Sequence, residues 1–235
     1  MKKQKLVILF LELLISVGVF AQRRDKVEYL SNFDKDFLHY GYYVGLNYLD
    51  YKIAYKAPDE FPNAYVETEP RLGFNIGLIG ELRLHDNINL RLEPGLMSNK
   101  KKLYFHHIDS ATDSIRFANS AFLHVPLLVQ FNTNRIHNIR PYVAVGVAYD
   151  LNFASNFNNP DDNSGGEFRM QKHNLMYELA VGMDFYFFYF KFSPSIRGVF
   201  AINDEILPDD ASNSQWTTPV DYLGTRGIFF RLTFQ

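Results

Sequence analysis

Apolar side chains occupy alternate positions along residues 71–84, RLGFNIGLIGELRL. The apolar set is Leu72, Phe74, Ile76, Leu78, Leu82 and Leu84, and Gly80 is its only gap. A period of two residues puts the two sets on opposite faces of a β-strand. The segment is therefore predicted to be a strand with one apolar face and one polar face that carries Arg71, Glu81 and Arg83.

The same alternation returns seven more times along the chain. The eight predicted strands cover residues 38–53, 71–84, 87–97, 120–131, 140–153, 173–187, 189–203 and 222–235. Each is long enough for the roughly 9–11 residues with which a tilted strand crosses a bilayer. Soluble strands are usually shorter, at about 5–6 residues.

Short and long connections alternate strictly between these strands. The short ones are residues 85–87, 132–138 and 188, and the long ones are residues 54–69, 98–119, 154–172 and 204–221. Transmembrane barrels have short periplasmic turns and long outer loops, whereas a soluble lipocalin-like barrel would keep its apolar side chains inside. The sequence predicts an all-β, eight-stranded antiparallel transmembrane barrel with both termini in the periplasm.

The N-terminal residues predict export from the cytoplasm. Lys2, Lys3 and Lys5 precede an apolar stretch that ends near Ala21, which is typical of a cleaved signal peptide. The predicted organisation is a signal peptide at 1–21, a periplasmic lead-in at 22–37 and a barrel domain at 38–235. The chain has no cysteine, so neither a lipoprotein anchor nor a disulfide framework is expected.

The overall composition agrees with a barrel better than with the other classes considered. A formal net charge of -2 does not suggest a nucleic-acid partner. A mean hydropathy of -0.18 argues against a helical membrane protein, but polar interior residues lower this average in a membrane barrel. Aromatic residues make up 16% of the chain, which suits both β-structure and aromatic girdles.

Charged residues recur on the polar faces of the predicted strands. The predicted inward-facing charges are Arg71, Glu81, Arg83, Arg91, Glu93, Glu178, Asp184, Lys191, Arg197 and Arg231. Side chains fill the interior of an eight-stranded barrel. We therefore expect a plug of salt bridges across the lumen and no open pore.

Two further groups of residues are candidate sites. Lys100, Lys101 and Lys102 are assigned to a loop, where they would either contact lipopolysaccharide phosphates or be solvated. His124 is expected to be a hydrogen-bonded lumen residue, with a proton-sensitive or metal site as the alternative. No pairing of nucleophile and base is recognisable, so we predict no catalytic residue, metal ligand or cofactor.

Four segments resemble known outer-membrane barrels of Bacteroidetes. FLHVPLLVQFN (122–132) resembles the LEIPLLLK strand of a widespread class of these barrels, and RPYVAVGVAYD (140–150) resembles the KPYVxxG strand that follows it. LHYGYYVGLNYLDYKI (38–53) resembles the first strand of PorT-like proteins, and residues 181–200 resemble the GxDFYFxYFKFSPSIR hairpin of the same family. The chain departs from the pattern at His124, which stands where the general motif has an acidic residue.

The resemblance implies a non-enzymatic barrel that supports protein secretion through the type IX system, which is tied to gliding motility in related bacteria. The implied partners are outer-membrane lipid and lipopolysaccharide, other secretion-system proteins, and the barrel-assembly machinery during biogenesis. The alternative is a small structural or adhesive outer-membrane barrel whose outer loops bind a ligand.

Overall fold

The computed structural model describes residues 27–56, 65–108, 110, 113–155, 168–207 and 216–235. The predicted signal peptide lies outside these ranges, as do residues 22–26 of the predicted lead-in. Within the described part of the chain, the helical structure is one 3-10 turn, η1 (Phe33–Lys35), and no helix could span a membrane.

Antiparallel strands form the rest of the regular structure. They are β1 (Leu38–Tyr55), β2 (Val66–Pro70), β3 (Leu72–His85), β4 (Ile88–Leu92), β5 (Gly95–Phe105), β6 (Ile115–Asn132), β7 (Ile139–Asn152), β8 (His173–Tyr186), β9 (Lys191–Ala201) and β10 (Val220–Phe234). β3 and β6 each pair with both β4 and β5, so β4 and β5 are two halves of one strand. β2 pairs with β5 beyond the end of β3, so β2 and β3 also count as one.

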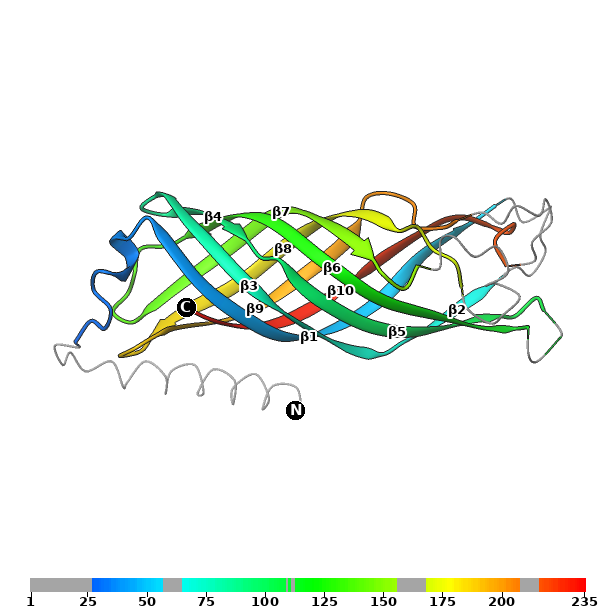
Figure 1. Ribbon diagram of the computed structural model, residues 1–235, viewed down its shortest axis with the longest axis horizontal. Coiled ribbons are helices and arrows are strands. Elements are labelled where there is room, and N and C mark those ends of the chain that lie inside the picture. The colour runs from blue at the N-terminus through cyan, green and yellow to red at the C-terminus, as the bar shows by residue number, and fades with distance from the viewer. Residues whose placement is uncertain (1–26, 57–64, 109, 111–112, 156–167, 208–215) are drawn as a thin grey trace, which may run out of the picture.

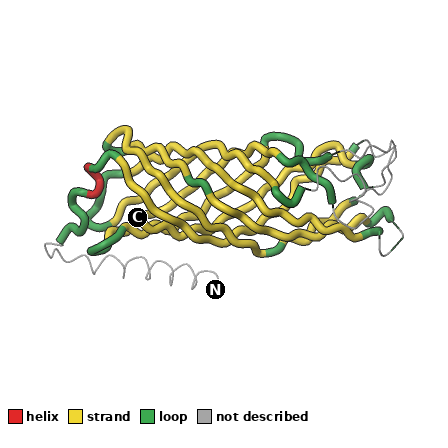
Figure 2. The backbone as a smooth tube through the Cα atoms, in the orientation of Figure 1, coloured by secondary structure: helices red, strands yellow, loops and turns green. Residues whose placement is uncertain are grey.

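Counted in this way, eight strands close into a barrel (Figures 1 and 2). β1 completes the ring, because Val44 pairs with Leu232 of β10 on one side and with Ile76 of β3 on the other. The prediction of an all-β, eight-stranded antiparallel barrel is therefore confirmed.

The two ends of the barrel differ in their connections. The short connections, residues 86–87, 133–138 and 187–190, lie at one end, which we call the turn end. The C-terminus is at this end too, where Gln235 exchanges backbone hydrogen bonds of 3.0 and 2.8 Å with Lys191. The remaining connections lie at the opposite end, which we call the loop end.

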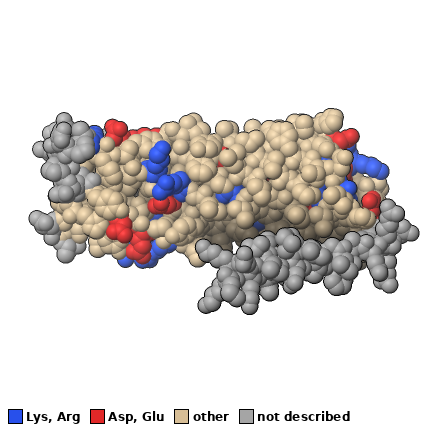
Figure 3. All heavy atoms as spheres, turned by 180° about the vertical axis from the view of Figure 1, so that it is seen from behind, with Lys and Arg blue, Asp and Glu red and all other residues tan. Residues whose placement is uncertain are grey.

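The outward face of the wall is apolar along most of the barrel. On β3, Leu72 and Leu78 are 72% and 65% exposed, whereas Asn75 and Glu81 on the alternate positions are buried. Figure 3 shows charged side chains near the two ends, with a broad uncharged wall between them. β3 thus faces outward with its leucines and inward with the carboxylate of Glu81.

Two strands extend further than the sequence predicts. β5 continues to Phe105 and β6 begins at Ile115, whereas residues 98–119 were expected to be a loop. The alternation of polar and apolar residues stops here, because Lys100, Lys101 and Lys102 put charges on both faces of β5. This region is therefore a hairpin, and its connection is only residues 106–114.

The interior changes from charged to apolar along the barrel axis. On β10, the inward residues Arg231, Phe229 and Leu223 follow one another from the turn end toward the loop end. Phe229 belongs to a middle apolar layer with Leu49, Met97, Phe122, Ala148, Met176 and Val199. Leu223 belongs to a loop-end cluster with Tyr51, Val66, Leu103, Phe105, Ala118, Phe168, Met170, Ile206 and Val220.

Candidate functional site

Glu93 is the centre of a buried ion-pair network. It follows the end of β4, just before Pro94, and only 1% of it is exposed. Its carboxylate lies 2.8 Å from a nitrogen of Arg197, 2.7 Å from Arg231 and 3.0 Å from Arg91. Burial of a carboxylate is costly unless it is paired and hydrogen-bonded, and here three cations provide the partners.

The network runs outward from Glu93 in two directions. Arg197 also contacts Glu178, at 2.7 Å. On the other side, Arg91 lies 3.5 Å from Glu81, which in turn lies 3.5 Å from Lys191. Lys191 continues the chain to Asp184, at 3.8 Å. The structure thus brings together eight of the predicted inward charges: Glu81, Arg91, Glu93, Glu178, Asp184, Lys191, Arg197 and Arg231.

The two other predicted inward charges lie outside this network. Arg71 points outward, with its side chain 48% exposed and paired with Glu69. From the Phe74–Ser98 pair to the Pro70–Lys101 pair, the β2–β3 strand advances by one residue more than β5 does. This extra residue is a bulge at Arg71, and it interrupts the inward–outward alternation of the strand. Arg83 lies at the turn-end mouth, where it pairs with Asp86.

His124 and Asp150 extend the network beyond the residues that the sequence assigned to it. They are cross-strand partners on β6 and β7, and Nδ1 of His124 is 2.6 Å from an Asp150 oxygen. Nε2 lies 2.9 Å from Glu178, although its alignment is too poor for a hydrogen bond. A ring with a carboxylate at each nitrogen is suited to the doubly protonated form. The alternation along β7 puts Asp150 on the inward face, but its partner depends on the strand register.

The three neighbouring lysines do not act as one group. Lys101 points into the barrel, where it is 1% exposed and its Nζ lies 3.8 Å from the centre of the Tyr51 ring. Lys100 and Lys102 project from the opposite face of β5, and Lys102 is the cross-strand partner of Glu69. The assignment of these lysines to a loop is corrected, because they lie on β5, whose alternation leaves Lys100 and Lys102 on the outer face. Contact of Lys100 and Lys102 with lipopolysaccharide stays a prediction.

A buried carboxyl group lies in the connection between β9 and β10. Glu205 accepts hydrogen bonds from the backbone N–H and the hydroxyl of Thr225, at 2.9 and 2.7 Å. Burial raises the pKa of the Glu205 carboxyl to about 7, against the opposing effect of Lys101. This group and the loop-end cluster together fill the barrel interior at its loop end.

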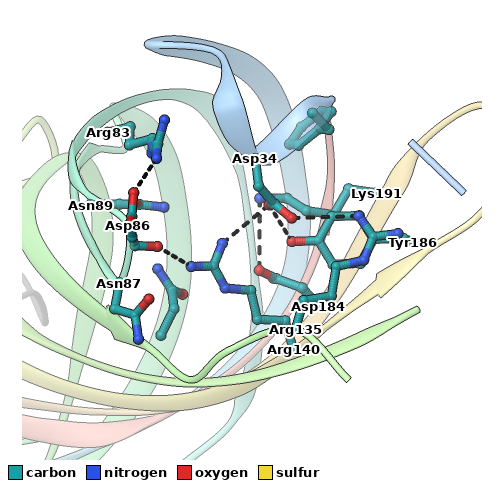
Figure 4. A network of polar contacts seen from close by, with 12 residues as sticks. Asp34, Arg83, Asp86, Asn87, Asn89, Arg135, Arg140, Asp184, Tyr186 and Lys191 are labelled. Atoms are coloured by element: carbon teal, nitrogen blue, oxygen red, sulfur yellow. Dashed lines mark hydrogen bonds and ion pairs between the residues drawn. The ribbon is translucent and has the colours of Figure 1, made fainter. Parts of the chain in front are cut away.

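Residues 27–37, which we call the N-terminal strap, lie across the turn-end mouth. Figure 4 shows Asp34 reaching into this mouth toward Arg140, Arg135 and Tyr186. Its carboxylate lies 3.1 Å from Arg140 and 3.4 Å from Arg135, and the Tyr186 hydroxyl donates to it at 2.6 Å. The sequence predicted a polar, irregular lead-in here and gave no signal for these contacts, which join residues more than 100 positions apart.

Further contacts hold the strap on both sides of Asp34. The Phe33 ring stacks on the His39 ring, with 4.2 Å between the ring centres. Nε2 of His39 forms a hydrogen bond of 2.7 Å with the Phe33 carbonyl oxygen. Arg83 donates to the carbonyl of Lys35 at 3.1 Å. The strap therefore caps the charged interior with an aromatic ring and a carboxylate.

An aromatic surface borders the strap on the outside of the barrel. The β8–β9 turn exposes Phe187, Phe188, Tyr189 and Phe190, although turns usually favour Gly, Asn, Asp and Ser. The ring of Phe188 packs edge-to-face on Tyr29 of the strap, with 5.8 Å between the ring centres. Beside the turn, a hollow of about 680 Å³ is lined by Tyr40, Gly41, Tyr42, Phe190, Phe234 and Gln235.

The charged groups of the interior are paired with one another. Its carboxylates and guanidinium groups contact one another across the lumen, and side chains fill an eight-stranded barrel. These charges therefore brace the strands from inside.

The chain matches a known family over most of its length. Residues 20–207 match the family model described as the outer membrane protein beta-barrel domain. No curated protein matches the chain.

Several solved structures are similar at low sequence identity. OprG from Pseudomonas aeruginosa is 13% identical, with 85% of this chain and 95% of that one covered and a TM-score of 0.47. Neisserial surface protein A is 8% identical, with 84% and 98% covered and a TM-score of 0.45. AlkL, solved in lipid bilayers, is 14% identical, with 91% and 94% covered and a TM-score of 0.42.

The family match agrees with two features of the barrel, its outer face and its interior. Its wall is apolar outside and its interior carries polar and charged side chains, which is the arrangement typical of lipid-embedded barrels. The chain belongs to the outer membrane protein β-barrel domain family and is an integral outer-membrane barrel.

Proposed function

We propose that this barrel is a non-enzymatic accessory of the type IX secretion system that works through contacts with other proteins. The supporting observation is the ion-paired interior, in which Glu93 is held by three arginines while Asp34 lies in the mouth. A barrel of this kind acts through its surfaces. In species that glide, the same system would link it to motility.

The choice of secretion rests on the PorT-like resemblance of residues 38–53 and 181–200. The second segment includes the β8–β9 turn, whose exposed aromatic residues form a surface of the kind that marks interaction sites. We propose that both termini and this turn face the periplasm, where secretion-system proteins would contact them. The barrel-assembly machinery would insert the chain, and lipopolysaccharide would surround its loop end.

A deletion in the source bacterium tests this proposal. Cargo with a type IX sorting domain should fall in the medium and accumulate in the periplasm, and a plasmid copy should restore export. A plasmid copy with Phe188→Ser and Tyr189→Ser should restore export poorly, whereas Phe153→Ser, an exposed aromatic position toward the loop end, should restore it fully. Unchanged export in the deletion strain would favour the alternative, a structural or adhesive barrel whose outer loops bind a ligand.

A further inference from the structure

The N-terminal strap is held by hydrogen bonds from Arg135 and Asn138 to its backbone and by a few of its own side chains, and much of it is exposed. Its 3-10 turn contains no buried residue, and Val27 and Phe37 near its two ends are 70% and 68% exposed. Leu30 in the strap has φ = 50° and His137 in the β6–β7 turn has φ = 56°, and these are the two non-glycine residues with positive φ in the described chain. Such backbone strain collects at functional and switching segments, and here it lies in the strap and in the turn that holds it.

The groups that bind Asp34 also have hydrogen-bond partners outside the strap. Arg140 donates to the carbonyls of Thr133 and Asp86 at 3.0 and 2.5 Å, and its side chain is 7% exposed. Arg135 donates to the carbonyl of His137 at 2.6 Å, and its guanidinium lies 3.7 Å from the centre of the Tyr186 ring. Arg135 also donates to the strap carbonyls of Tyr29 and Leu30. The two guanidinium groups and the Tyr186 hydroxyl thus form a cradle for a carboxylate and for the peptide backbone beside it.

An aromatic site adjoins this cradle. The Phe33 ring lies on His39, with the Lys191 ammonium 5.0 Å from its centre and the Tyr186 ring 6.2 Å away. Phe33 and Asp34 therefore enter the mouth as a pair, an aromatic residue followed by a carboxylate. Within the described residues, Asp34 is the carboxylate with which Arg135 and Arg140 form ion pairs.

We propose that this cradle is a binding site for an acidic peptide segment of a partner protein, and that the strap occupies it in cis. The ligand would carry an aromatic side chain followed by Asp or Glu, as the strap itself does. Paired guanidinium groups favour carboxylates through charge-assisted hydrogen bonds, and the His39 ring offers a stacking surface for the aromatic. This proposal is independent of the secretion role, because it concerns what the purified barrel binds.

A peptide with the sequence of residues 27–37 tests the proposal on the full-length barrel in detergent micelles. The double variant Phe33→Ala/Asp34→Asn should release the strap, and a fluorescently labelled peptide should then bind about tenfold or more tightly than to the wild type, because the tethered competitor is weakened. The matched control is Asp36→Asn/Phe37→Ala, which changes the same residue types at exposed positions of the strap. The control should bind the peptide as weakly as the wild type does.

Two further comparisons decide the outcome. A peptide with Asn in place of Asp34 should lose binding, and adding Arg140→Gln to the released barrel should abolish it. Equal binding by both peptides, or no difference between the released and control barrels, would overturn the proposal. Folding of each variant is checked by its change in gel mobility on heating. If the double variant does not fold, Asp34→Asn alone replaces it. This single variant should give the same order of affinities.

Discussion

Glu93 lies where the side chains of three arginines meet, so its charge supports more of the interior than any single pair does. Arg197 also forms an ion pair with Glu178, and Arg91 forms one with Glu81. Loss of the central charge would leave several buried cations with fewer partners. Removal of one partner from a buried ion pair is strongly destabilising, whereas exposed pairs contribute little.

Glu93→Gln is therefore expected to destabilise the folded barrel by about 3–5 kcal/mol. The measurement is unfolding in urea in detergent micelles, followed by the gel mobility of unheated samples. Glu69→Gln is the matched control, because Glu69 pairs with Arg71 on the exposed surface and its loss should change little. Equal effects of the two substitutions would show that the network does not hold the strands.

Individual inward charges could be predicted from alternation alone, but their partners could not. Glu81, Arg91 and Arg197 follow the two-residue period of their strands, which fixes the face on which each lies. Arg71 was misplaced because a bulge adds one residue to the strand, and a bulge leaves little trace in a single sequence. The His124–Asp150 pair needed the register between β6 and β7.

At the scale of elements, the sequence predicts the strands well where one face meets lipid. The prediction fails on β5 beyond Met97, because a strand that rises above the apolar wall has polar residues on both faces and loses its period. The sequence also predicts an irregular lead-in at the N-terminal strap and does not predict its contacts. These contacts come from arginines of the distant β6–β7 region. Both omissions concern segments at the ends of the barrel.

The connection between β9 and β10 should respond to pH through Glu205. Burial raises the pKa of this carboxyl to about 7, and Asp150 on β7 acts in the same direction while Lys101 on β5 opposes it. The unfolded chain releases the proton near the ordinary pKa of about 4.3. The stability contributed by the neutral carboxyl is therefore complete below that value and is lost as the pH rises through about 7.

Glu205→Gln should flatten this dependence, because the amide is uncharged throughout. The wild type should melt a few degrees higher at pH 5 than at pH 8, and the variant should show a smaller difference. Fluorescence of Trp216, the single tryptophan, reports from the same connection, where its ring lies 4.4 Å from the Arg116 guanidinium. Asp221→Asn, at an exposed site at the start of β10, should leave the dependence intact; an unchanged dependence in Glu205→Gln would refute the assignment.

At the scale of the whole molecule, three different fillings follow one another through the barrel. The N-terminal strap covers the turn end, the ion-pair network fills the interior next to it, and mainly apolar layers follow toward the loop end. The ion-pair network contains side chains from strands on different sides of the ring, as Glu93 between β4 and β5 and Arg231 on β10 show. The network therefore ties the wall together from inside.

We expect the ion-pair network to close the barrel independently of the strap, so the protein should not conduct ions in either state. In planar lipid bilayers, the wild type and Phe33→Ala/Asp34→Asn should both give no unitary current steps, while a porin added to the same bilayer shows that insertion and recording work. Reproducible steps from the wild type would contradict the closed interior and favour a channel. Steps from the released variant alone would place the seal in the strap, and the Glu93 network would then be a brace that leaves a water path beside it.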